Sequence, residues 1–215
     1  DQTNHKFKHA LIQEAAYQTQ TKNDRQTAHR RIAQVLQSDF PNVVATQPEF
    51  MARHWAAGGK TLEAVACWIK AGKLASQRSA CQEAIGHFKA GLALIKALAS
   101  VPDRVRMELD LQIGLGAAAT ATQGYASTEG ARAYARAMTL CSQHEGDLGI
   151  FPAIWGIWAS ASSRVGYAGA LKLAQKLLRM ASQSSDPVQD QQGHFAVADT
   201  LYWLGKFAVA REHLE

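Results

Sequence analysis

The sequence predicts an all-α fold in which antiparallel helical hairpins repeat along the chain. Apolar residues recur at helical spacing through most of the 215 residues, whereas strand-like alternation is nearly absent. In the clearest stretch, 81–98, one apolar stripe is formed by Ala84, Ile85, Phe88, Leu92 and Ile95. Only 5 prolines interrupt a chain rich in Ala, Leu, Gln, Lys and Arg, which lose little rotamer freedom on a helix.

Start and stop signals divide the first half of the chain into helices. Thr46 and Glu49 have the spacing of a capping box, and so do Ser79 and Gln82. The pair Gly58-Gly59 predicts a helix end followed by a turn. We therefore expect helices near 8–19, 24–38, 47–57, 61–77 and 81–98.

The second half is divided in the same way. Gly124, Gly166 and Gly205 each lie between apolar-periodic segments, as turn glycines do. Asp186-Pro187 predicts a helix cap followed by proline at the first helical position. The expected helices are 103–122, 128–143, 149–163, 168–183, 189–204 and 207–215.

Small residues recur early in the second helix of four successive hairpins. Their separations are 46, 40 and 40 residues, and they are Ala84, Gly130, Ala170 and Ala210. A small side chain lets two helices approach closely, and a larger residue follows four positions later at Phe88, Tyr134 and Leu214, with Ala174 the exception. Self-similarity at such a period is typical of a solenoid, in which each hairpin buries its apolar side against the next.

The last unit resembles a tetratricopeptide repeat (TPR). In 197–214 the small positions are Ala198 and Ala210, the turn is Gly205, and the larger residues are Phe207 and Leu214. The stretch 59–71 resembles the turn and second helix of the same motif, with Ala64, Trp68 and Ala71. The array is degenerate because its spacing exceeds the usual 34 residues, Ser79 replaces a turn glycine, and no proline closes the units. The resemblance implies a right-handed superhelix of hairpins.

The start of the chain is similar to a junction in large bacterial signalling proteins. The stretches 7–17 (FKHALIQEAAY) and 29–33 (HRRIA) resemble the place where a STAND-type, AAA-like ATPase core ends in a winged-helix segment and is followed by helical repeats. Short segments such as 151–156 (FPAIWG) resemble the group fused to class III adenylate or guanylate cyclases. The resemblance implies that 1–45 is a helical linker ending the ATPase module and that 46–215 are TPR-like repeats. The chain has no initial methionine and stops within a helical pattern, so we expect a piece of a larger protein, C-terminally truncated.

Composition restricts the setting and the partners. Cys67, Cys81 and Cys141 have no paired spacing, which excludes a recognisable disulfide framework or zinc motif and favours a cytoplasmic location. No stretch of about 18 apolar residues could span a bilayer, and no apolar leader is visible. The net charge is +5, with basic residues concentrated near the start at Lys6, Lys8, Lys22, Arg25, Arg30 and Arg31. We interpret them as a solvated helix face rather than a nucleic-acid contact.

No pattern indicates catalysis, a metal or a cofactor. The sequence 58–61 (GGKT) ends like a phosphate-binding loop, but His54 stands where that motif needs glycine, and a helix rather than a strand precedes it. His5 and His9 lack a third ligand at natural spacing. Ser162, Ser163 and Cys141 lack the context of an activated nucleophile.

The resemblance implies a non-catalytic regulatory region that binds proteins or peptides, including upstream domains of the same chain. The five tryptophans have the helical spacing that is typical of core residues. Transferring the repeat register nevertheless predicts a partner-binding groove lined by Ile69, Lys73, Gln77, Gln112, Trp155, Gln192, Phe195, Asp199, Tyr202 and Trp203. The alternatives are a ligand-sensing domain with a small-molecule effector in the groove, or a nucleic-acid-associated domain of a transcriptional regulator.

Overall fold

The structure, a computed structural model, describes residues 10–98, 102–143, 150–161 and 166–215, and every regular element there is an α-helix. The first four helices are α1 (Ala10–Thr19), α2 (Lys22–Asp39), α3 (Pro41–Thr46) and α4 (Pro48–Ala57). The middle four are α5 (Thr61–Gln77), α6 (Cys81–Ile95), α7 (Pro102–Gln123) and α8 (Thr128–Gln143). The last four are α9 (Ile150–Ala161), α10 (Gly166–Ala181), α11 (Pro187–Trp203) and α12 (Phe207–Glu212). The predicted all-α class is confirmed for these residues.

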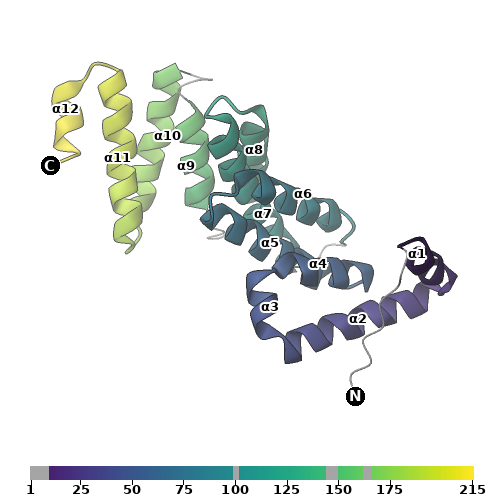
Figure 1. Ribbon diagram of the computed structural model, residues 1–215. Coiled ribbons are helices and arrows are strands. Elements are labelled where there is room, and N and C mark those ends of the chain that lie inside the picture. Colours follow the sequence, from purple (N-terminus) through teal and green to yellow (C-terminus); the bar gives the residue numbers. More distant parts are fainter. Residues whose placement is uncertain (1–9, 99–101, 144–149, 162–165) are drawn as a thin grey trace.

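The helices form an elongated array in chain order (Figure 1). From α2 onward each helix packs against the next one, while α5 also contacts α7, and α7 also contacts α9. Helices α9 to α12 stand side by side at one end, and α1 lies at the other. This pattern is expected where every hairpin buries its apolar side on its neighbours.

Two aromatic rings connect the hairpins of the middle region. The ring of Phe88 on α6 lies directly against Gly72 of α5 and Gly114 of α7, and a Cβ at either glycine would overlap the ring. Tyr134 on α8 lies in the same way against Gly116 of α7 and Gly156 of α9. Both rings are buried, with 1% and 5% of their residues' surface exposed. Two of the larger residues that recur in the sequence, Phe88 and Tyr134, therefore pack between neighbouring hairpins, whereas the third, Leu214, is exposed.

Three inter-helix turns share one geometry. Gly59, Ser79 and Gly205 have φ of 73°, 60° and 75°, in the left-handed region. In each turn the next residue's N–H donates to the carbonyl five residues before it, with N–O distances of 2.8, 2.9 and 2.9 Å. This is the Schellman arrangement, which satisfies carbonyls at a helix end. Ser79 adopts the conformation that its position, equivalent to a turn glycine, requires.

Of the predicted helix caps, one is confirmed and two are wrong. Asp186 caps α11 as predicted, because its Oδ1 accepts from the N–H of Val188 at 2.9 Å. The two capping boxes are wrong: the residues preceding α4 and α6 are Gln47 and Ala80, neither of which makes a side-chain cap. The hydroxyl of Thr46 instead donates to the carbonyl of Asn42 within α3, a six-residue helix for which the sequence carries no signal.

The buried apolar residues form separate clusters along the array, and among the described residues one carboxylate is buried with them. Glu108 on α7 is 7% exposed, and its Oε1 accepts from the Nε of Arg136 on α8 at 2.7 Å. A buried carboxylate requires such a partner because desolvation of an unpaired charge is costly. Among the described residues, no helix combines the length and the apolar character needed to cross a bilayer.

Candidate functional site

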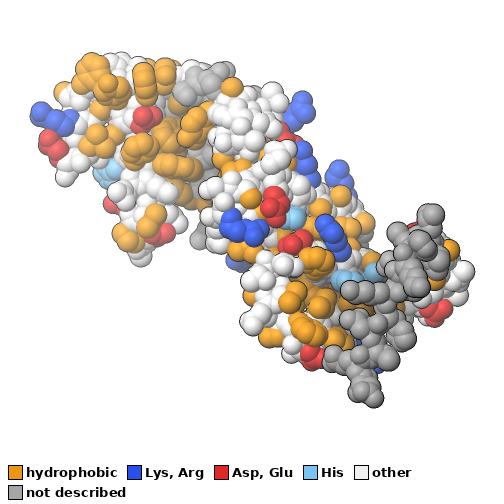
Figure 2. All heavy atoms as spheres, in the orientation of Figure 1, with side chains coloured by type: hydrophobic (Ala, Val, Ile, Leu, Met, Phe, Trp, Pro, Cys, Tyr) orange, Lys and Arg blue, Asp and Glu red, His pale blue; other side chains and the backbone are white. Residues whose placement is uncertain are grey.

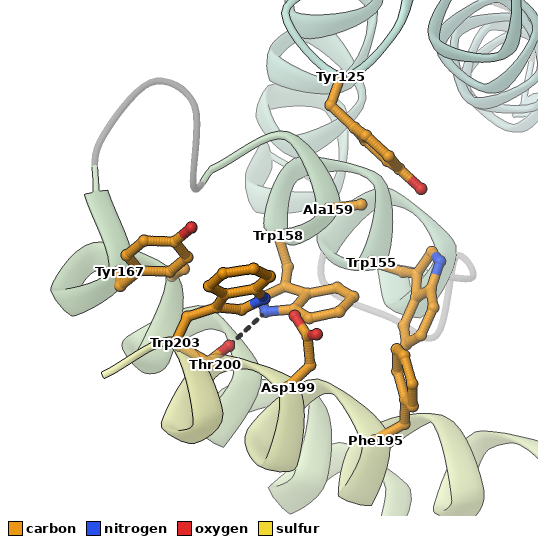
Figure 3. Close-up of a pocket in the computed structure, with 10 residues that line it drawn as sticks. Tyr125, Trp155, Trp158, Ala159, Tyr167, Phe195, Asp199, Thr200 and Trp203 are labelled. Carbon is orange, nitrogen blue, oxygen red and sulfur yellow. Dashed lines mark hydrogen bonds between the residues drawn. The ribbon is translucent and has the colours of Figure 1, made fainter. Parts of the chain in front are cut away.

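Aromatic side chains gather around a cavity of about 400 Å³ between α9, α10 and α11 (Figure 3). Its described lining residues are mostly aromatic or small: Tyr125, Trp155, Trp158, Ala159, Tyr167, Ala170, Phe195, Asp199, Thr200 and Trp203. A volume of this size falls within the range of small-ligand sites, about 300–1,000 Å³. We call this cavity the aromatic pocket.

Helical spacing explains why these residues meet. On α11, Phe195, Asp199 and Trp203 are four residues apart, so they form one stripe along the helix. On α9, Trp155 and Trp158 are three residues apart and share the face directed toward α11. Two neighbouring helices thus supply most of the pocket, as expected for the inner surface of an array of hairpins.

The rings form two groups. The indole of Trp155 lies 4.9 Å from that of Trp158, and both lie 6.2 Å from the ring of Phe195, measured between centroids. Across the pocket, Tyr167 stacks on Trp203 at 6.0 Å with an angle of 13° between the planes. These separations are within the range in which aromatic rings attract one another.

The inner wall is fixed by a hydrogen bond. Trp158 is 7% exposed, and its Nε1–H donates to Oγ1 of Thr200 at 2.9 Å (Figure 3). The Thr200 hydroxyl in turn donates to the carbonyl of Ala196 at 2.7 Å. Since both polar groups are buried and paired, the Trp158 ring is held in one orientation.

Asp199 brings a carboxylate to the pocket. Its side chain points toward the Trp158 indole, and on α11 it lies between Phe195 and Trp203 (Figure 3). It is the one charged side chain among the described lining residues, and within the described part of the chain it makes no hydrogen bond or ion pair. The pocket therefore combines aromatic faces with a single negative charge.

Four of the ten residues predicted to line the groove lie together in the structure. Trp155, Phe195, Asp199 and Trp203 all line the aromatic pocket. Tyr202 is 55% exposed and lines a neighbouring cavity of about 340 Å³ between α11 and α12. Gln192, one turn before Phe195, is half-buried and lines neither cavity in the described structure.

The remaining predicted residues lie on α5 and α7, outside the aromatic pocket. Lys73 on α5 is exposed and pairs with Asp110 of α7 at 3.4 Å, while Gln77 is exposed and Gln112 is half-buried. Ile69 is 7% exposed and belongs to the core of α5 to α8, so its side chain faces the interior rather than an open groove.

Three other pocket residues have little or no sequence signal. Trp158 is three residues after Trp155, and this spacing alone suggests a shared face. Tyr125 follows Gly124 in the turn before α8, and Tyr167 is the second residue of α10. Neither tyrosine lies at a groove position of the repeat register, so only the tertiary arrangement reveals them.

Among the described residues, the other candidate motifs form no second site. Gly58 ends α4 and Gly59 forms the turn, so the GGKT sequence is a helix end, as predicted. No group of three metal-ligating residues occurs among the described positions, whereas His5, His9, Ser162, Ser163 and the Cys141 side chain lie outside them. Burial raises the pKa of the Cys67 thiol, an effect that Lys70 opposes and Glu63 reinforces, and a protonated thiol is a poor nucleophile.

Two histidine pairs join helices. Nδ1 of His29 on α2 lies 3.0 Å from Nδ1 of His54 on α4, and Nδ1 of His194 on α11 lies 3.1 Å from Nδ1 of His213 beyond α12. Burial, and then the charge of His29, lowers the pKa of His54. In each pair one Nδ1 must donate and the other accept.

Exposed apolar side chains occur over two regions (Figure 2). One covers α11 and α12, where Trp203, Phe207 and Leu214 are 58%, 60% and 67% exposed. The other runs along α2, where Ile32 and Val35 are 43% and 42% exposed. Of the basic residues near the start, Arg25 lies over the Tyr17 ring at 5.2 Å and Arg30 donates to the Gln26 carbonyl, so both are engaged within the chain.

Comparison with known proteins adds one relative. No protein-family model matches the chain, and no solved structure matches it significantly. The chain is similar to an uncharacterized protein of Rhizobium meliloti (strain 1021), with 28% identity over 192 residues. The match covers 87% of this chain but 18% of that protein, so the chain spans less than a fifth of its relative's length.

Proposed function

We propose that this chain is a non-catalytic regulatory region that binds polypeptides within a larger signalling ATPase of the STAND type, linked to a class III nucleotide cyclase. In this proposal the hairpins form a TPR-like right-handed superhelix in the cytoplasm, and the region uses no cofactor of its own. The observation that carries it is the aromatic pocket, where Trp155, Phe195, Asp199 and Trp203 come together from two successive first helices of the array.

Exposed aromatic residues at the pocket support polypeptide binding. Phe195 and Trp203 are 49% and 58% exposed, although large aromatic residues are usually buried. Aromatic anchors supply apolar contact area with few rotamers to restrict, which is why they dominate binding hot spots. Together they offer two anchor points along one face of α11.

The apolar face of α2 supports contact with another domain of the same chain. Ile32 and Val35, with Arg31 and Leu36, line a shallow hollow on this helix. A neighbouring domain packed there would remove these apolar side chains from water, which stabilises the assembly. The length of the Rhizobium meliloti relative, more than five times the matched stretch, is consistent with a multidomain protein.

Regulation in this proposal is a shift between states of the ATPase. A partner on the repeats favours the state that it binds more tightly, and the shift cannot exceed its differential affinity for the two states. The region needs no catalytic group for this role.

The first test is the reading frame that surrounds this chain in its genome. A phosphate-binding loop and a cyclase-type domain upstream would support the proposal, and the lack of both would remove the family argument. In the intact protein, Phe195→Ala and Trp203→Ala should change the response of ATPase or cyclase output to a partner, while Lys172→Ala on the exposed face of α10 should not. A partner that binds tightly without altering either output would contradict the regulatory role.

Ligand sensing is the second candidate, because the aromatic pocket has the size of a small-molecule site. A sensed ligand would raise the apparent stability of the chain, since it binds the folded state only. A screen of metabolites by thermal shift tests this candidate without knowledge of the parent protein.

A further inference from the structure

The faces of the pocket's rings provide negative electrostatic potential. Aromatic rings carry partial negative charge on their faces, and a cation within about 6 Å of a ring centroid is attracted to it. Trp155, Trp158 and Phe195 pack on one another with centroids 4.9–6.2 Å apart, so a cation held in the pocket against this cluster would lie near more than one ring.

Asp199 adds a full negative charge at the same place. No Lys or Arg is present among the described residues that line the pocket, and within the described structure the carboxylate has no internal partner. A half-buried carboxylate beside aromatic rings attracts a cation more strongly than the rings alone, because the carboxylate charge and the ring faces are both negative. The chain as a whole is basic, with a net charge of +5, so this acidic site is a local feature.

The few hydrogen-bond acceptors of the pocket restrict which class of cation can bind there. A primary ammonium has three N–H donors to satisfy, whereas a fully alkylated ammonium has none. The Thr200 hydroxyl already accepts from Trp158 and donates to Ala196, which leaves the Asp199 carboxylate as the one anionic acceptor among the described lining residues. A sugar would also stack on the rings, but it would need several polar partners for its hydroxyls.

We propose that the aromatic pocket binds a small organic cation that carries a quaternary or otherwise fully alkylated ammonium group. The rings of Trp155, Trp158 and Phe195 contact the alkyl groups, Asp199 balances the charge, and Trp203 with Tyr167 covers the outer side. This inference rests on the second candidate function, ligand sensing in the aromatic pocket, and names the class of ligand; it requires neither an ATPase nor a cyclase. If it fails, polypeptide binding at exposed aromatics is untouched.

The experiment compares choline with 3,3-dimethyl-1-butanol, its uncharged carbon isostere. Both are titrated into the 215-residue chain by isothermal calorimetry, with indole fluorescence as a second readout. Choline should bind at least about tenfold more tightly than the isostere, a difference of about 1.4 kcal/mol. Equal affinities, or no saturable binding of choline, would overturn the proposal.

Substitutions inside and outside the aromatic pocket test whether choline binds there. Asp199→Asn and Trp155→Leu should each weaken choline binding about tenfold or more. The controls are Asp190→Asn, an exposed carboxylate in the first turn of α11, and Phe50→Leu, an exposed aromatic residue on α4; both should stay within about twofold of the parent chain. Circular dichroism melting establishes that each variant is folded.

Two further ligands separate the competing occupants. Glucose binding tighter than choline binding would assign the pocket to a carbohydrate. A lysine-containing peptide that binds through Asp199 while choline does not would assign it to a protein side chain. Either result would overturn the small-cation proposal, and insensitivity of choline binding to Asp199→Asn would do so as well.

Discussion

Replacing Gly114 by alanine tests the packing between hairpins most directly. Gly114 is within α7, and the ring of Phe88 lies against its Cα from one side as it lies against Gly72 from the other. An alanine Cβ at this position would be nearer to the ring carbons than real side chains approach. The ring cannot withdraw, because the opposite side is closed by Gly72, so the helices themselves must separate.

Gly86 on α6 provides the matched control. It is exposed, and a Cβ there would meet no atom within 4 Å. Gly86→Ala should therefore stabilise the chain by about 0.8–1.0 kcal/mol through helix propensity alone. Gly114→Ala receives the same gain but adds an overpacking cost of about 1–3 kcal/mol. The difference between the two variants, about 1–3 kcal/mol, measures the packing term because the propensity term cancels.

Urea unfolding followed by circular dichroism at helical wavelengths measures both free energies. For a chain of this size, each 1 kcal/mol corresponds to a change in melting temperature of about 2–4 °C. The melting temperature of Gly114→Ala should therefore lie below that of Gly86→Ala by about 2–4 °C for each 1 kcal/mol of packing cost. If both substitutions stabilise the chain equally, Phe88 does not hold the two hairpins together as described.

Three further predictions concern buried polar groups. Thr200→Val leaves the buried Trp158 indole N–H without its acceptor and should cost about 1–3 kcal/mol in urea unfolding, whereas in the Trp158→Phe background the same change should cost clearly less. Burial lowers the pKa of His54 from 6.5, so the folded state takes up its proton less readily than the unfolded chain, and stability should fall as the pH drops through 6.5; His54→Gln should reduce this loss, and an unchanged pH profile would refute the assignment. Burial raises the pKa of Tyr134 from 10.0 to about 12 against the opposing Thr120 hydrogen bond, so stability should fall as the pH rises from 10.0 toward about 12, and Tyr134→Phe should remove that loss in alkaline unfolding curves.

Most of the fold could be predicted because long amphipathic helices are encoded locally. The expected helices 61–77 and 128–143 have the observed bounds of α5 and α8, and most of the other ends lie within two residues of the expected ones. The short helix α3 could not be predicted, since six residues that include Val43 and Val44 show no amphipathic period. The capping boxes failed because Gln47 and Ala80, one residue later in each case, precede the helices α4 and α6.

The candidate site was only partly predictable. The stripe of Phe195, Asp199 and Trp203 follows from spacing on one helix, so the sequence is sufficient to place these residues together. The contributions of Tyr125 and Tyr167 depend on where two turns lie relative to α9 and α11, which no local pattern specifies. Ile69 was assigned to the groove from the repeat register, but its apolar side chain lies in the core.

The glycine contacts of Phe88 and Tyr134 also bear on which units of the array are interchangeable. Gly114 and Gly156 are 42 residues apart and each faces the ring of the hairpin before it. Removing α7 and α8 as a block would thus bring Gly156 against Phe88, and the shortened array would keep its fit. The third hairpin breaks this modularity: Ala174 replaces the ring, and Tyr167, the one aromatic residue of α10, stacks on Trp203 instead. The aromatic pocket lies at this break, where one unit can no longer substitute for another.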